Sequence, residues 1–181
     1  MPPEDSPPGS AAEPARERTV TWDDPLILAA AASGRAGLDF VQGIVSGEFA
    51  PPPIARTLGF EMVAVSCGFA EFALEPAEFH YNPIGSVHGG VYAALLDSAA
   101  GCAVQTTLPA GTAYTSLDLS VKFLGAIRVG TGRVTCTGTV IHRGRRTALA
   151  EARLCAADGK LLAFATSSCL ILSPDNPPAS G

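Results

Sequence analysis

The sequence predicts an α+β fold in which one antiparallel sheet packs against one central helix. Two strand-like runs come before a long apolar segment at about residues 89–108, and β-rich runs follow it. Turn residues separate these runs, which is typical of antiparallel hairpins. A helix of 20 residues would be about 30 Å long, enough to cross a small sheet. Together these features indicate a curved sheet wrapped around the helix.

The expected strands are runs of β-branched, aromatic and small apolar residues bounded by turns. Cys67-Gly68 separates the first two runs, and Asp158-Gly159 separates the last two, where Asp-Gly between apolar runs is a strong hairpin signal. The other turns contain Gly125 and His142-Arg143-Gly144-Arg145. The six expected strands cover residues 57–65, 69–74, 113–124, 129–141, 147–156 and 160–172.

The segment at 89–108 is apolar on every side, which predicts a buried helix. Its one carboxylate is Asp97. Burial of a carboxylate costs several kcal/mol unless it is paired, hydrogen-bonded or protonated. Two interpretations remain open: Asp97 bonds a neighbouring group, such as the adjacent Ser98, or it is a general base or nucleophile made reactive by a low local dielectric.

The rest of the chain divides around this domain, which we expect at residues 54–172. Residues 1–24 are rich in Pro, Glu, Ala and Ser, which predicts a disordered tail. Residues 25–50 have the spacing of one or two short helices, and Pro51-Pro52-Pro53 is expected to end this helical extension. Residues 173–181 are expected to be a flexible tail.

Composition excludes several classes of function. The net charge of −5 argues against binding to nucleic acid or to an anionic membrane surface. No apolar run approaches the roughly 18 residues of a membrane span, and the N-terminus lacks a secretory pattern, so we expect a cytoplasmic protein. Three scattered histidines and five cysteines without C-x-x-C spacing predict no metal site.

His88-Gly89-Gly90 lies where the helix should begin. Backbone N–H groups are unpaired at a helix start and the helix dipole is positive there, so the site suits an anion or a polarised carbonyl oxygen. The alternative is a tight turn that needs glycine. His88 by itself is more often structural, and Asn82 is by default a turn residue whose amide could also bond a substrate carbonyl.

Helix geometry keeps Gly89 and Asp97 apart. They are eight residues apart in the sequence, which corresponds to about 12 Å along a straight helix. One subunit can hardly bring both to the same carbonyl carbon. If both act on one bond, the protein is a dimer with two equivalent shared sites.

The spacing Asn82-x5-His88-Gly89-Gly90-x6-Asp97, followed by the strand Ser116–Leu124, resembles the hotdog-fold acyl-CoA thioesterases of the phenylacetyl-CoA (PaaI) type over about residues 54–172. The resemblance implies a hotdog fold, a homodimer or homotetramer, and hydrolysis of acyl-CoA to a free acid and CoA without a cofactor. It also implies that the Gly89 N–H polarises the thioester carbonyl, while Asn82 and His88 shape that end of the site. Asp97 of the partner subunit would activate water or attack directly, and Ser116 would orient the water or the carboxylate.

Other residues have weaker claims to substrate contact. Gly90 adds a second glycine at the helix start. Arg143, Arg145 and Arg146 form either a solvated hairpin tip or a contact with CoA phosphates, and Lys122 and Arg128 could contribute in the same way. Tyr81, Tyr92 and Phe123 line an acyl pocket or belong to the ordinary core. The pattern does not indicate which acyl group is bound.

Two other functions compete with hydrolysis. Hotdog enoyl-thioester hydratases and dehydratases place a His beside their carboxylate, whereas Asp97 has no His next to it in the sequence. A non-catalytic acyl-CoA-binding module also fits, although the cations of residues 1–50, which are Arg16, Arg18 and Arg35, do not suggest a DNA-binding extension. The minimal family domain lacks these 50 residues, which we expect to be the tail at 1–24 and a helical extension at 25–50 that packs over the acyl or dimer region.

Overall fold

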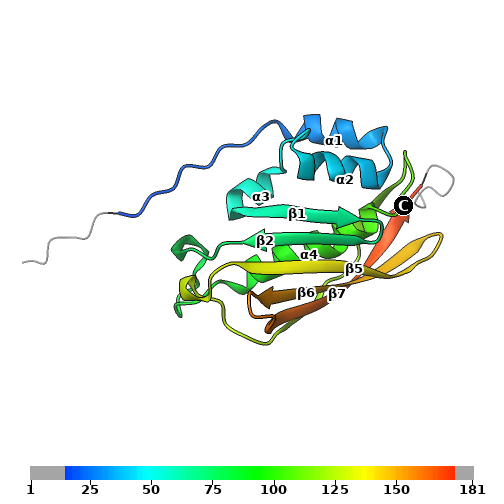
Figure 1. The fold of residues 1–181 in the computed structure, drawn as a ribbon. Coiled ribbons are helices and arrows are strands. Elements are labelled where there is room, and N and C mark those ends of the chain that lie inside the picture. The colour runs from blue at the N-terminus through cyan, green and yellow to red at the C-terminus, as the bar shows by residue number, and fades with distance from the viewer. Residues whose placement is uncertain (1–14, 174–181) are drawn as a thin grey trace, which may run out of the picture.

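The computed structural model describes residues 15–173 and confirms the curved antiparallel sheet around one long helix (Figure 1). The seven-stranded sheet has the order β1-β2-β5-β6-β7-β3, and β4 also pairs with β7. The strands are β1 Phe60–Ser66, β2 Phe69–Leu74, β3 Ala113–Ser116, β4 Ser120–Phe123, β5 Val134–Arg143, β6 Thr147–Ala156 and β7 Leu161–Leu172. The helices are α1 Pro25–Ser33, α2 Gly37–Ser46, α3 Pro53–Leu58 and α4 Gly89–Gln105, with 3₁₀ turns at Glu78–His80 and Val129–Thr131.

Helix α4 packs tightly into the concave side of the sheet. A Cβ added at Gly138 of β5 would lie 2.0 Å from the Ala99 carbonyl oxygen, so glycine lets the strand and the helix approach. The buried core includes Leu95, Leu96, Ala99, Ala100 and Ala103 of this helix. Small side chains on α4 therefore allow the close packing that positions the rest of the fold.

The prediction that α4 is buried on every side is wrong for a single chain. Ala93, Ala94, Asp97 and Ser98 are only partly buried and recur at helical spacing on one face. The sheet covers the other side of the helix, because it wraps around α4 without closing into a full barrel. Asp97 thus lies on the face that the chain itself leaves open.

Three expected boundaries differ from the structure. Pro51-Pro52-Pro53 does not only end a helix: Pro53 begins α3, a position that suits proline because its missing N–H is not needed there. The strand expected from residue 57 therefore starts at Phe60, and the strand expected from residue 129 starts at Val134 after a 3₁₀ turn. The run at 113–124 is two strands, because residues 117–119 bulge opposite Ser167 and Ser168.

Two predicted hairpin turns are confirmed. Gly68 and Gly159 have φ angles of 77° and 83°, in the left-handed region that favours glycine.

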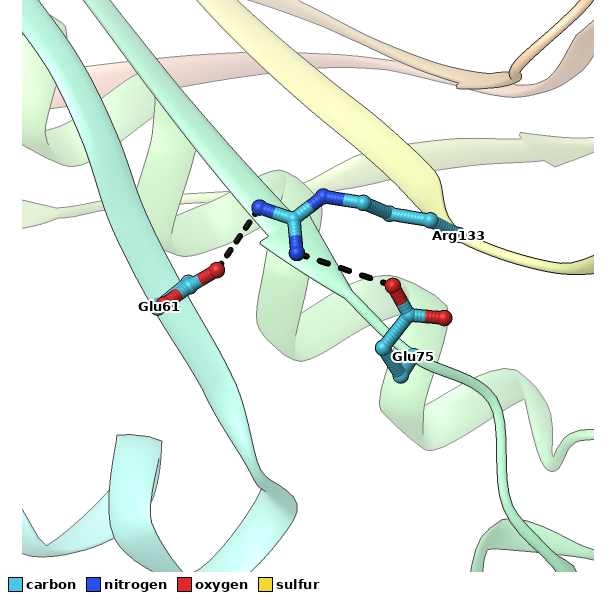
Figure 2. Close-up of polar contacts among 3 residues, drawn as sticks. All are labelled: Glu61, Glu75 and Arg133. Carbon is cyan, nitrogen blue, oxygen red and sulfur yellow. Dashed lines mark hydrogen bonds and ion pairs between the residues drawn. The ribbon is translucent and has the colours of Figure 1, made fainter.

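At the end of β1 and β2 opposite the Gly68 turn, Arg133 forms ion pairs at the ends of both strands (Figure 2). Its guanidinium contacts Glu61 at 2.7 Å and Glu75 at 3.6 Å, and so links the ends of β1, β2 and β5.

Helices α1 and α2 lie beyond β1 (Figure 1), and α2 packs against β1 and α4. Gly37 begins α2, and its N–H donates to the Leu108 carbonyl oxygen at 2.8 Å. Residues 15–24, part of the predicted tail, form no helix or strand, but Arg18 donates to the carbonyl oxygens of Arg56 and Thr57 at 3.0 and 2.6 Å. Residues 1–14 and 174–181 of the predicted tails lie outside the described residues. Within residues 15–173, no helix is long and apolar enough to cross a bilayer.

Candidate active site

The start of α4 leaves one backbone donor without a partner. His88 is the N-cap, and its Nδ1 accepts the Gly90 N–H at 2.9 Å, while its carbonyl oxygen accepts the Val91 N–H at 2.9 Å. The Gly90 N–H is therefore already engaged. Among residues 15–173, the Gly89 N–H has no acceptor. A substrate oxygen at this helix start would meet the Gly89 donor and the positive end of the helix dipole.

A hollow of about 330 Å³ surrounds Gly89. The Phe123 ring forms one wall, and a Cβ added at Gly89 would lie 3.2 Å from its Cζ. Phe123 is exposed, as a ring lining an open site should be. Glycine at position 89 therefore keeps the backbone N–H accessible beside an aromatic wall.

Tyr92 and Tyr81 have structural contacts beside this hollow. The Tyr92 hydroxyl donates to the Gly125 carbonyl oxygen at 3.0 Å and accepts the Ile127 N–H at 2.6 Å, and burial raises the pKa of Tyr92. The Tyr81 hydroxyl accepts the Val129 N–H at 2.8 Å. Both hydroxyls fix the segment after β4, which favours the interpretation of these tyrosines as core residues.

Asn82 organises the turn that precedes α4. Its Oδ1 accepts the N–H groups of Ile84 and Ser86 at 3.1 and 3.2 Å, and its Nδ2 lies 3.2 Å from the Ser86 hydroxyl. These bonds give Asn82 the turn role that its residue type predicts. It also lines the hollow around Gly89, so it shapes that end of the site through the loop.

A second hollow, of about 400 Å³, contains Asp97. Ser116 of β3 donates from its hydroxyl to Asp97 Oδ1 at 3.1 Å, so strand and helix meet at the carboxylate. Ala93 and Ala94 form the helix side of the hollow, and residues 117–119 form the strand side. The adjacent Ser98 does not supply the hydrogen bond; Ser116, distant in sequence, does.

The two hollows share no lining residue. Gly89 and Asp97 lie on the same uninterrupted 17-residue helix, so eight residues of helical rise hold them about 12 Å apart. One chain therefore presents a helix start with a free N–H and a mid-helix carboxylate in two separate hollows.

The three hairpin arginines lie far from the hollow around Gly89. Arg143, Arg145 and Arg146 are exposed at the β5–β6 hairpin. The base of this hairpin is near the C-terminal end of α4, because Val140 bonds Gly68 and Gly68 bonds Thr106. The hairpin and the segment before α4 lie at opposite ends of the sheet (Figure 1). Lys122 and Arg128 are exposed nearer to Gly89, on either side of the Phe123–Ile127 segment.

Two residues near Asp97 were not singled out by sequence reasoning. The Tyr114 ring packs against Gly101, one helical turn after Asp97, where an added Cβ would lie 2.3 Å from the Tyr114 oxygen. Burial, reinforced by the Asp97 charge, raises the pKa of the Cys102 thiol to about 12 and also raises the pKa of Tyr114. The one signal in the sequence was Gly101 itself, since glycine inside a helix often marks a close approach.

Comparisons with known proteins identify relatives of this chain. Residues 84–163 match the thioesterase superfamily. A 1,4-dihydroxy-2-naphthoyl-CoA hydrolase of Listeria monocytogenes is 30% identical over 118 residues, which cover 65% of this chain and 93% of the relative. Human acyl-coenzyme A thioesterase 13 is 29% identical over 60% of this chain and 77% of its own length.

Solved structures show the same fold. A thioesterase-like phenylacetic acid degradation-related protein of Ralstonia eutropha superposes with a TM-score of 0.64 at 31% identity, covering 71% of this chain and 97% of that protein. The PaaI protein of Escherichia coli has a TM-score of 0.65 at 21% identity, with coverages of 73% and 93%. The chain therefore belongs to the thioesterase superfamily and has the hotdog fold.

Proposed function

We propose that this protein hydrolyses acyl-CoA thioesters to a free carboxylic acid and CoA, at sites that each combine Gly89 of one subunit with Asp97 of the partner subunit. Membership of the thioesterase superfamily supports thioester hydrolysis, and both curated relatives described above are named as enzymes that act on CoA esters. The observation that carries the proposal is the pair of half-sites. One has a free N–H at a helix start, and the other has a carboxylate held by Ser116.

The two half-sites have complementary chemistry. The Gly89 N–H donates to the thioester carbonyl oxygen and stabilises the negative charge that develops when the carbonyl carbon is attacked. Asp97 either takes a proton from the attacking water or attacks the carbon itself, forming an anhydride that water then hydrolyses. Ser116 holds the carboxylate or the water in position. When water attacks, collapse of the tetrahedral intermediate breaks the C–S bond and the CoA thiolate takes back the proton that Asp97 removed from water. When Asp97 attacks, the C–S bond breaks as the anhydride forms, and the CoA thiolate takes a proton from water before the anhydride is hydrolysed.

The open face of α4 supports a shared site. Ala93, Ala94 and Asp97 are only partly covered in one chain, and small side chains let another copy approach closely. Strand β3 is at an edge of the sheet, and Leu117 just after it is 58% exposed. A homodimer, or a homotetramer built from such dimers, would cover these residues and place the two half-sites together twice through its two-fold axis.

The exposed cations are the proposed partners of the CoA phosphates. Lys122 neighbours Phe123, which lines the Gly89 hollow. Arg143, Arg145 and Arg146 share one hairpin at the far end of the sheet. Because salt screens exposed charges, contact with phosphates predicts a KM that rises with ionic strength. Variants that remove the charge of Lys122, or the charges of the hairpin arginines, should show which of these groups causes the dependence of KM on ionic strength.

An Asp97→Asn variant tests the reaction directly. We expect thiol release from acyl-CoA esters to fall roughly 100- to 10,000-fold, because the amide cannot act as a base or nucleophile. Asp118→Asn is the matched control. Asp118 lines the same hollow, but its Oδ1 accepts the Ser168 N–H at 3.1 Å, a bond that an amide oxygen can also accept. Equal activity of wild type and Asp97→Asn would contradict the assignment of Asp97.

Mixed oligomers test the shared site. Asp97→Asn and Gly89→Pro chains should each be nearly inactive alone. Random pairing makes half of the dimers mixed, and each mixed dimer has one intact site of two, so activity should recover to about one quarter of wild type. No recovery after verified subunit exchange would mean that both groups act within one chain.

Other outcomes distinguish the competing functions. If the wild type binds CoA esters but releases no thiol, the protein is a binding module. Hydration of an enoyl-CoA without thiol release would indicate a hydratase. The carboxylate contact favours hydrolysis over hydration, because the hydrogen-bond donor to Asp97 is Ser116 and no histidine within residues 15–173 contacts the carboxylate.

A further inference from the structure

A cavity of about 410 Å³ lies between the N-terminal helices and the thioesterase domain. Ala29 and Ala32 of α1 and Phe40 and Ile44 of α2 form its outer wall. Cys102 of α4 and Tyr114 of β3 form the inner wall. Its volume falls within the range of about 300–1,000 Å³ that is typical of small-molecule sites.

The inner wall is adjacent to Asp97. Ser116, which bonds Asp97, and Tyr114 are two residues apart on β3, so their side chains lie on the same face of the strand. On α4, Cys102 follows Asp97 by five residues, a rise of about 7.5 Å. The cavity and the Asp97 hollow share no lining residue, so a group attached to a carbonyl carbon at Asp97 has to pass the Tyr114 side chain, which is only partly buried, to reach the cavity.

The cavity favours an apolar occupant. The residues of α1 and α2 that face it are mainly alanine, valine, isoleucine and phenylalanine. On the opposite wall, the pKa of the Cys102 thiol is raised to about 12 by burial, so this group is uncharged at neutral pH. No residue with a charged side chain lines the cavity among the residues described. The transfer of a hydrocarbon group from water into such surroundings is favourable.

Helix α1 forms part of the outer wall of the cavity but is itself poorly buried. It is almost entirely apolar, yet none of its residues is fully buried. Within the described residues, the hydrogen bonds of α1 are to its own helix and flanking residues. Helix α2 is anchored more firmly, through the bond from the Gly37 N–H to the Leu108 carbonyl oxygen. Helix α1 contacts α2, and an apolar guest in the cavity would add a second packing surface for Ala29 and Ala32.

We propose that this cavity binds the acyl group of the substrate, as an aromatic or medium-length hydrocarbon, and that residues 25–46 set the size of the group accepted. The proposal rests on the function proposed for Asp97, which places the carbonyl carbon at the Asp97–Ser116 pair, two residues along β3 from Tyr114. The N-terminal helices thus determine specificity without contacting the reacting atoms.

Ala32→Leu tests the proposal by filling the cavity from α1. Thiol release is measured with acetyl-, hexanoyl-, octanoyl-, benzoyl- and phenylacetyl-CoA. We expect kcat/KM for the larger esters to fall about tenfold or more, as filling a hydrophobic pocket does, while acetyl-CoA is unaffected. The comparison of alkyl and aryl esters in the wild type identifies which hydrocarbon fits.

Two further variants control for stability. Ala30→Leu adds the same side chain to α1 at an exposed position that does not line the cavity, and should keep the wild-type profile. Ile44→Ala enlarges the cavity from α2 and should shift preference toward longer chains. If both cavity variants keep the wild-type profile, the proposal is overturned while the thioesterase function stands.

If no ester releases thiol, the proposed acyl-CoA hydrolysis is refuted. The acyl cavity is then tested by binding measurements instead of by activity. Calorimetry would compare the non-hydrolysable thioethers S-hexyl-CoA and S-methyl-CoA. Tighter binding of the hexyl thioether by the wild type, lost in Ala32→Leu but kept in Ala30→Leu, supports an acyl cavity. Equal affinities for the two thioethers in the wild type would refute it.

Discussion

Ser116 Oγ donates a 3.1 Å hydrogen bond to Asp97 Oδ1, and this bond joins the edge strand β3 to the open face of α4. The chain bulges immediately after Ser116, where Ser167 donates to the Asp118 carbonyl oxygen at 2.8 Å. The bulge allows residues 117–119 to form one side of the Asp97 hollow. The carboxylate is thus held by a strand end whose backbone is itself fixed.

Ser116→Ala should lower kcat about 10- to 100-fold, because a hydrogen bond to a charged group contributes roughly 1.5–3 kcal/mol. The reduced orientation of Asp97 affects the chemical step more than substrate binding, so KM should change little. Ser120→Ala, an exposed serine on the neighbouring strand β4, is the matched control and should retain full activity. Equal kcat for the two variants would remove Ser116 from the site.

Gly89→Pro should reduce kcat roughly 100- to 1,000-fold by deleting the oxyanion donor. Gly89 is the first residue of α4, the position at which proline is tolerated because its φ angle suits the helix start. Gly89→Ala keeps the N–H and adds a Cβ 3.2 Å from the Phe123 ring, so it reports the steric effect alone. If both variants lose the same activity, the steric contact explains the loss and the N–H does not.

The order of elements could be predicted because each run has one dominant local signal. Asp158-Gly159 and Cys67-Gly68 sit at turns whose glycines have positive φ, and these turns are readable from residue type. The bulge at 117–119 could not be predicted, because Ser116–Leu124 alternates as one continuous strand would and only pairing with β7 reveals the break. Helix α3 was missed because three prolines were interpreted as a stop, although the third begins a helix.

For the candidate site too, some features could be predicted from the sequence and others could not. Gly89 and Asp97 share one helix, so their separation follows from sequence spacing alone. The acyl cavity depends on contacts between α1, α2, α4 and β3, which are distant in sequence. Likewise, the open face of α4 could not be predicted, since apolar alanines do not show which side of the helix the sheet leaves uncovered.

Gly37→Ala should destabilise the fold by about 1–3 kcal/mol, despite the usual preference of helices for alanine. The added Cβ would lie 1.7 Å from the Gln105 carbonyl oxygen, so α2 must move away from α4. Gly34→Ala is the control, because a Cβ there has no neighbour within 4 Å. Urea unfolding should show a lower midpoint for Gly37→Ala alone; an unchanged midpoint would mean that α2 shifts without loss of packing.

We expect His80 to make the stability of the fold depend on pH. It is 3% exposed, its Nδ1 accepts the Ala77 N–H at 3.0 Å, and its Nε2 lies 2.6 Å from the Leu58 carbonyl oxygen. Because Nδ1 is the acceptor, the neutral ring carries its proton on Nε2 and donates it to Leu58. Burial lowers the pKa of His80, against the opposing effect of the Leu58 bond and with a contribution from the Arg18 charge.

The unfolded chain therefore binds a proton on His80 more readily than the folded protein does as pH falls below the ordinary histidine pKa of about 6.5. The free energy of unfolding should decrease from pH 7 toward pH 5, with at most about 1.4 kcal/mol per pH unit coming from this one group. His80→Gln should give a shallower slope in urea titrations, because it removes the titrating ring. His142→Gln, at an exposed position on β5, should keep the wild-type slope. The carboxylates contribute equally to the pH dependence of the free energy of unfolding in all three proteins. Identical slopes for His80→Gln and wild type would therefore show that protonation of His80 does not oppose folding.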